Sequence, residues 1–134
     1  MQFKVTFAVI CGYLSFALGG CDTVLKTLIY LAVADYITGV IVAIYKREIS
    51  SKIGYKGICK KAMMFFIVAL ANFVDNAVGA EIVRNITIVF YISNEGISIL
   101  ENADKMGVPV PQKIREVLKQ FKENKKEGDK DGDN

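Results

Sequence analysis

The chain contains no histidine and no tryptophan, and only three of its 134 residues are cysteine. Without histidine it lacks the usual general base of enzymes near neutral pH and the commonest protein ligand of metal ions. The cysteines, Cys11, Cys21 and Cys59, are odd in number and form no CxxC motif, so neither a disulfide framework nor a zinc site is indicated. These absences argue against a histidine-based enzyme and a disulfide-stapled secreted domain.

Glycine-rich nucleotide motifs are absent as well. The sequence has no GxGxxG and no GKS or GKT, so neither dinucleotide nor nucleoside triphosphate binding has support. We therefore expect no enzyme activity, no cofactor and no metal site.

Long apolar stretches dominate what is present. Hydrophobic residues make up 52% of the chain, and the mean hydropathy is +0.32. Four stretches, 5–21, 24–45, 62–80 and 82–100, are close to the roughly 20 residues that a helix needs to cross a bilayer. They lack strand-like alternation, so we predict an all-α polytopic membrane protein with three to four transmembrane helices.

The composition changes after Leu100. Pro109 and Pro111 interrupt the chain, and apolar residues then recur at helical spacing over 112–122. This pattern predicts an amphipathic helix, which either lies on the membrane surface or packs on the bundle, followed by a charged tail over 123–134. We expect a transmembrane helical domain over 1–101 and a cytoplasmic part over 102–134.

Positive charge predicts the orientation. All but two of the 17 Lys and Arg residues, Lys26 and Arg84, fall before the first stretch, between the second and third, or after the fourth. Because Lys and Arg favour the cytoplasmic side, four spans place both termini in the cytoplasm of a bacterium. The segment 46–61 is predicted as a basic loop that faces anionic lipid headgroups rather than nucleic acid. Its basic residues are Lys46, Arg47, Lys52, Lys56, Lys60 and Lys61.

The first stretch has an alternative interpretation. Lys4, the apolar run and the small residues before Cys21 resemble a signal peptide with a lipoprotein cleavage site. Cleavage there would leave a chain that begins almost inside the next apolar stretch, so we favour a membrane span.

Polar residues inside the apolar stretches are the candidate functional residues. An Asp at the centre of a membrane helix, as Asp35 is expected to be, costs about 2.5–3.5 kcal/mol of insertion free energy. A stripe of such residues on each span can line a hydrated lumen or bind a second copy of the chain. The candidates for these roles are Asp35, Thr38, Gly39, Asn72, Asp75, Asn76, Arg84, Tyr91, Glu95 and Ser98. Alternatively, the stripes only hold the helices of one molecule together, with a salt bridge between Asp75 and Arg84.

Several segments resemble the toxin-secretion and phage-lysis holins, including the clostridial toxin-export type. They are DYITG at 35–39, Ser51, Gly54, GI at 57–58, KK at 60–61, Asp75, FYISNEGISILEN at 90–102 and GVPVP at 107–111. The match covers roughly residues 24 to 118, with the elements in order and correctly spaced. No second methionine lies near the start, since the next after Met1 is Met63, so an inhibitor made from a nearby internal start, which many holins have, is not supported here.

The resemblance implies a protein that oligomerises with itself in the bacterial cytoplasmic membrane and opens pores or lesions. An endolysin, or in some relatives a large toxin, leaves through them without direct binding, and the host cell lyses. The residues alone leave two alternatives open. One is a small ion-coupled transporter with Asp35 or Glu95 as the carrier carboxylate, and the other is an antiholin or accessory membrane subunit.

Overall fold

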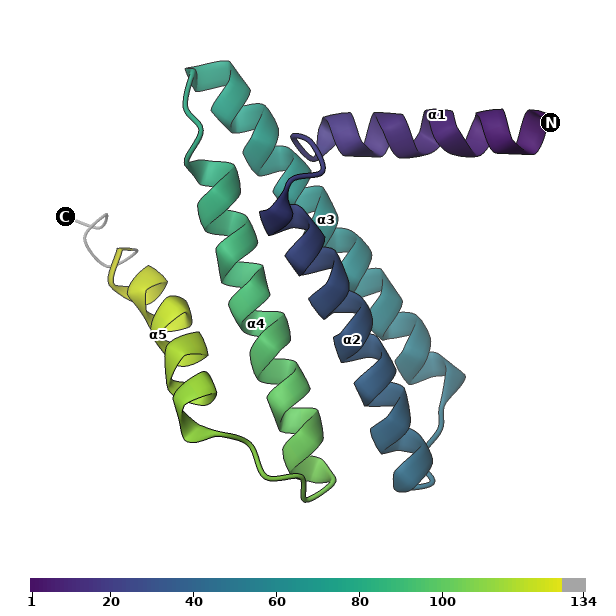
Figure 1. Ribbon diagram of the computed structural model, residues 1–134, viewed down its shortest axis with the longest axis vertical. Coiled ribbons are helices and arrows are strands. Elements are labelled where there is room, and N and C mark those ends of the chain that lie inside the picture. Colours follow the sequence, from purple (N-terminus) through teal and green to yellow (C-terminus); the bar gives the residue numbers. More distant parts are fainter. Residues whose placement is uncertain (129–134) are drawn as a thin grey trace.

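Helices account for the whole ordered fold of the part that the structure, a computed structural model, describes, which is residues 1–128 (Figure 1). They are α1 (Gln2–Ala17), α2 (Thr23–Tyr45), α3 (Ser51–Val78), α4 (Val83–Lys105) and α5 (Gln112–Gly128). No strand occurs among the described residues, so the all-α prediction is confirmed for them. The last six residues of the predicted charged tail, 129–134, lie outside the described residues.

Three of the helices form a bundle with one apolar core (Figure 1). α2 packs most extensively against α4, and α3 packs against both. Buried apolar side chains from all three helices form this core. They are Leu25, Leu28, Ala32, Met64, Val68 and Ile88. The α2–α3 and α4–α5 connections lie at one end of the bundle, and the α1–α2 and α3–α4 connections lie at the other.

Local sequence signals explain where the bundle helices begin and end. The Asp22 carboxylate accepts a hydrogen bond of 3.0 Å from the backbone N–H of Leu25 and so caps the start of α2. α3 ends at Gly79, whose φ of 69° lies in the left-handed region that glycine adopts without strain. The third and fourth stretches therefore form a tight helical hairpin.

The outer surfaces of α2 and α3 are apolar. Both helices are long and apolar enough to cross a membrane by length and composition, and α1 is apolar but shorter. Large side chains such as Tyr30 on α2 and Phe66 on α3 are 72% and 70% exposed. Two candidate spans are fewer than the three to four predicted, because polar residues interrupt α4 and α1 has only 16 residues.

α1 does not run along the bundle as the predicted span 5–21 would. It ends at Ala17 and points sideways away from the bundle, near the end where α2 begins (Figure 1). The chain turns at Gly19 and Gly20, whose φ angles of 83° and 96° are open mainly to glycine. No residue of α1 is buried, so its position depends on contacts at the turn.

The segment predicted as a loop over 46–61 is helical from Ser51 onward. Gly54 and Gly57 suggest a loop in the sequence, but in the structure they lie on the face of α3 that meets Tyr36 of α2. A Cβ at Gly54 would lie 3.3 Å from the Tyr36 Oη atom, and one at Gly57 would lie 3.9 Å from its ring. The two glycines thus allow close packing of α2 and α3 rather than a break in the helix.

The predicted amphipathic helix forms α5, which extends beyond the expected 112–122 to Gly128. Of the two positions that the sequence left open, it takes the second and packs along α4 (Figure 1).

Candidate functional site

An ion cluster joins the three bundle helices near the middle of α2. Lys61 of α3 donates hydrogen bonds of 2.8 Å to the Asp35 carboxylate of α2 and 2.5 Å to the Glu95 carboxylate of α4. The side chains of Lys61, Asp35 and Glu95 are 18%, 19% and 8% exposed. Two carboxylates therefore share one ammonium group between the helices, which leaves one net negative charge when all three are ionised.

Amide and hydroxyl groups complete this cluster on the side of α4. The Asn102 amide donates to the Asp35 Oδ1 atom at 3.2 Å and to the Thr38 Oγ1 atom at 2.9 Å. Thr38 in turn donates to the backbone carbonyl of Asp35 at 3.1 Å. Gly39 lies beside them, since a Cβ there would be 3.9 Å from the Asn102 amide nitrogen. We call Asp35, Thr38, Lys61, Glu95 and Asn102 the central cluster.

A second cluster of polar residues fixes the turn between α1 and α2. The buried Arg84 guanidinium donates to the backbone carbonyls of Leu18 and Gly20 and, at 2.8 and 3.1 Å, to both carboxylate oxygens of Asp22. Asn72 of α3 donates to the carbonyl of Ala17 at 3.1 Å. We call Asp22, Asn72, Asp75 and Arg84 the elbow cluster.

The Arg84 guanidinium holds the pKa of the Asp22 carboxyl below its usual value, mainly through these hydrogen bonds. Asp22 caps α2 and binds Arg84 at the same time, so one carboxylate links the start of α2 to α4. The Asp22 side chain is 47% exposed. Solvent therefore screens its ion pair with Arg84 and weakens it, although Arg84 itself is buried.

Asp75 has a different role from the salt bridge considered in the sequence. Its carboxylate accepts the backbone N–H groups of Val83 and Arg84 at 3.0 and 2.8 Å, and so caps the start of α4. The guanidinium of Arg84 pairs with Asp22 instead. An Asp75–Arg84 side-chain ion pair is absent from the described residues.

The central cluster and the elbow cluster lie far apart along α2. From Asp22 to Asp35 a helix rises about 20 Å. The apolar core lies between them, with Leu28, Val68 and Ile88 fully enclosed. The bundle thus has an apolar middle layer with a polar layer on each side of it. Among the described residues, no buried side-chain nitrogen or oxygen atom lacks a hydrogen-bond partner.

The remaining sequence candidates lie outside these clusters. Asn76 is exposed on α3, and Ser98 donates to the backbone carbonyl of Asn94 within α4. Tyr91 packs against the apolar core. The basic candidates other than Lys61 are exposed, with Lys46 and Arg47 in the α2–α3 connection and Lys52, Lys56 and Lys60 on α3.

Sequence reasoning missed three members of the clusters. It assigned Lys61 to the surface loop, and its candidate residues include neither Asp22 nor Asn102. The available signal for Asn102 was its spacing, because it lies seven residues after Glu95 and therefore on the same helical face.

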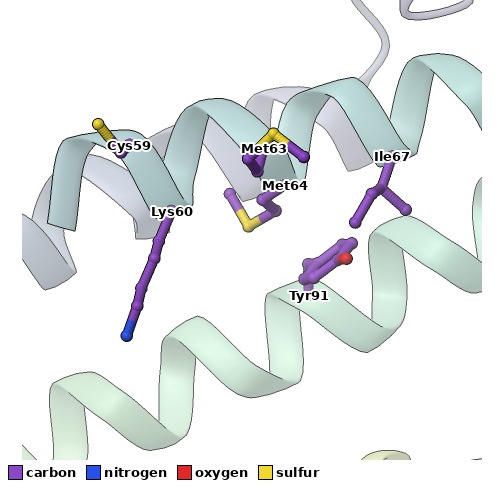
Figure 2. Close-up of a pocket in the computed structure, with 6 residues that line it drawn as sticks. All are labelled: Cys59, Lys60, Met63, Met64, Ile67 and Tyr91. Atoms are coloured by element: carbon purple, nitrogen blue, oxygen red, sulfur yellow. The ribbon is translucent and has the colours of Figure 1, made fainter. Parts of the chain in front are cut away.

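A shallow apolar groove of about 290 Å³ runs between α3 and α4 (Figure 2). Met63, Met64 and Ile67 of α3 and Tyr91 of α4 face into it, and the Lys60 side chain extends at one end. The groove is open and nearly without polar lining atoms, so it offers no constellation for catalysis. Within residues 1–128, no group of three His, Cys, Asp or Glu residues is placed to hold a metal ion.

Comparison with known proteins gives a consistent set of relatives. The bacteriophage holin family matches residues 12–123. An uncharacterized protein of Listeria monocytogenes is 40% identical over 132 residues, covering 95% of this chain and 92% of that protein. An uncharacterized 14.9 kDa protein of Clostridium perfringens is 40% identical over 109 residues, covering 80% and 83%. A protein named "Probable holin" from Bacillus phage phi105 is 36% identical over 95 residues, covering 70% of each chain. No solved structure matches the chain significantly.

Proposed function

Because this chain belongs to the bacteriophage holin family, we propose that it is a holin, a non-enzymatic protein that oligomerises in the bacterial cytoplasmic membrane. Its oligomers open pores or lesions through which an endolysin, or a large toxin, leaves, and the host cell then lyses. The phage relative whose name is a probable holin supports this function. The observation that carries the proposal is the central cluster, three ionisable side chains held inside a bundle with an apolar exterior.

We propose that α2, α3 and α4 cross the bilayer. α2 and α3 supply the apolar outer surface. α4 carries most of the polar residues but lies against α2, α3 and α5, which shield it from lipid. The basic α2–α3 connection and the α4–α5 connection lie at the same end of the bundle, so that end and the C-terminal tail are cytoplasmic under the positive-inside rule.

α1 decides between three and four spans. Four spans, with both termini in the cytoplasm, need α1 to stand along the bundle. In this structure α1 points sideways away from the bundle, at the opposite end from the basic connections (Figure 1). We therefore favour three spans, with α1 in the plane of the membrane near its outer surface.

The opening mechanism that we propose starts from a closed monomer. Each carboxylate of the central cluster has a hydrogen-bond partner inside its own chain, so a dispersed copy carries at most one uncompensated charge of this cluster into lipid. When copies associate, their helices separate from one another and water replaces Lys61 as the partner of Asp35 and Glu95. A charge that faces water avoids the cost of burial. The open form therefore becomes more favourable once water has entered between the helices.

The candidate lumen and self-association residues named from the sequence keep these roles in the proposal, together with Lys61 and Asn102. Collapse of the membrane potential is the trigger that we propose, because one charge moved across 100 mV changes the free energy by about 2.3 kcal/mol. Anionic lipid headgroups surround the basic end, and neither a cofactor nor nucleic acid takes part.

Induced expression in a bacterium together with an endolysin tests the proposal. A holin stops growth abruptly and releases the endolysin, whereas the endolysin alone leaves the cells intact. Graded effects that depend on an added solute would instead support the ion-coupled transporter. An antiholin or accessory subunit would do little alone but would shift the lysis time of a co-expressed holin. Either of these outcomes contradicts the proposed function.

A further inference from the structure

α5 docks on a face of α4 that has a glycine at its centre. Gly96 is buried, and a Cβ there would lie 2.9 Å from the Cδ1 atom of Leu118 in α5. The absence of a side chain at Gly96 therefore makes room for Leu118. Ser93, which precedes Gly96 by three residues on the same helical face, is also buried. This face of α4 accepts a second helix at close range.

One exposed ion pair adds to this contact. Arg115 donates to both carboxylate oxygens of Asp104 at 2.8 and 2.9 Å, and the two side chains are 32% and 45% exposed. Exposed pairs of this kind contribute little to stability. The other apolar residues of α5 remain about half exposed, at 49% for Ile114, 43% for Val117 and 51% for Phe121. The docked helix is thus held weakly and buries only part of its apolar face.

In a bilayer, the position of this contact along the proposed spans disfavours the docking of α5 on α4. Gly96 follows Glu95 of the central cluster, so α5 passes the cytoplasmic half of the proposed spans. Its exposed residues Lys113, Glu116 and Lys119 carry charge into that region. Charged side chains that face hydrocarbon raise the free energy of the docked state. A helix held by one exposed ion pair and by apolar side chains that are only partly buried can therefore be displaced by a competing partner.

We propose that α5 is an autoinhibitory cover over the self-association surface of this chain. Docked, it occupies the α4 face centred on Gly96 and holds the monomer closed. Released, it leaves that face to the same face of a second copy, whose helix can approach closely at Gly96. The competition makes assembly depend on the density of copies in the membrane. This inference rests on the proposed holin function and adds a regulatory element to it.

Charge reversal on α5 tests the cover in vesicles of phosphatidylethanolamine and phosphatidylglycerol loaded with a fluorescent dye. Arg115→Glu places two carboxylates together and should lower the protein-to-lipid ratio for half-maximal dye release by about two- to five-fold. Lys119→Glu is the matched control, since it makes the same charge change on the exposed side of the same helix and should leave the ratio unchanged. The exchanged pair Asp104→Arg/Arg115→Asp should restore the wild-type ratio. Equal shifts in Arg115→Glu and Lys119→Glu would show a general charge effect and overturn the inference.

A tether between the two helices gives a second test in which one protein is its own control. In a chain with Cys11, Cys21 and Cys59 replaced by serine, Asp104→Cys and Arg115→Cys place two thiols at the two ends of the exposed ion pair, where a short bis-methanethiosulfonate reagent can join them. The cross-linked protein should lose dye release, and reduction should restore it. Release by the cross-linked form at the reduced form's ratio would overturn the inference while leaving the holin function intact. If wild-type and reduced proteins both leave the vesicles sealed at every ratio, the proposed function fails and the inference fails with it.

Discussion

The Lys61 ammonium lies 2.8 Å from the Asp35 carboxylate and joins α3 to the middle of α2. The same ammonium contacts Glu95, so one lysine is shared by the two carboxylates of the central cluster and neutralises half of their charge. This arrangement reconciles an apolar exterior with acidic residues at membrane depth. It also makes Lys61 the residue whose loss should disturb the closed monomer most.

Lys61→Met should destabilise the folded bundle by about 3 kcal/mol, because it leaves two nearly buried carboxylates without their cation. Lys60→Met is the matched control. Lys60 is the exposed neighbour, has no ion pair among residues 1–128, and should change the free energy by less than about 0.5 kcal/mol. Unfolding in mixed micelles with increasing dodecyl sulfate, followed by far-ultraviolet circular dichroism, measures both. Equal effects of the two substitutions would contradict the role assigned to Lys61.

Asp35→Asn should delay lysis more than it alters the amount of protein in the membrane. Asn keeps a hydrogen-bond acceptor for Asn102 but removes the charge that gains hydration when the bundle opens. Without the Asp35 charge, Lys61 and Glu95 form a pair with no net charge, which stabilises the closed bundle. A stabilisation of about 1 kcal/mol corresponds to about five-fold slower opening. Onset of lysis after induction and immunoblots of membranes measure the two quantities. Glu48→Gln, which neutralises an exposed carboxylate in the α2–α3 connection, should leave the onset unchanged.

The helical content could be predicted from the sequence, because the apolar stretches and the capping residues act locally. Asp22 before α2 and Gly79 after α3 mark helix ends that the structure contains. The start of α3 was predicted wrongly, since Gly54 and Gly57 look like loop residues when only their neighbours in sequence are considered. Their physical role is to admit Tyr36 of α2, which is visible only once the two helices are packed.

The clusters depend on contacts between residues far apart in the chain, and local periodicity contains no such information. Asp35 and Glu95 were recognised as residues that need partners, but Lys61 lies 26 and 34 residues away from them. The direction of α1 likewise could not be predicted from the sequence. A Gly19-Gly20 pair predicts a turn, whereas its angle is set by Arg84, 66 and 64 residues away from the two carbonyls that it binds.

Gly19→Ala should destabilise the elbow more than Gly20→Ala. Both residues have positive φ angles, so each substitution carries a backbone cost of about 1–2 kcal/mol. At Gly19 the added Cβ would also lie 2.5 Å from the Asn72 Oδ1 atom and 2.6 Å from the Arg84 Nε atom, whereas nothing lies within 4 Å of one at Gly20. Free energies of unfolding in the same micelles compare the two variants. A larger loss for Gly20→Ala would show that the elbow cluster does not fix this turn.

Acidification should release α5 from α4. The Arg115 guanidinium lowers the pKa of the Asp104 carboxyl, mainly through its hydrogen bonds. Above the pKa of the free carboxyl, about 3.9, Asp104 is ionised and its interaction with Arg115 contributes fully to docking. This contribution is lost as the pH falls through the lower pKa of the docked state. A spin label at Lys119→Cys, in the chain whose three native cysteines are replaced by serine, should therefore become more mobile as the pH falls below about 4. In the same labelled chain Arg115→Gln removes the interaction, so its label should be mobile already at pH above about 5 and should change less on acidification. Equal pH dependence with and without Arg115 would mean that other carboxyl groups, and not Asp104, control the release of this helix.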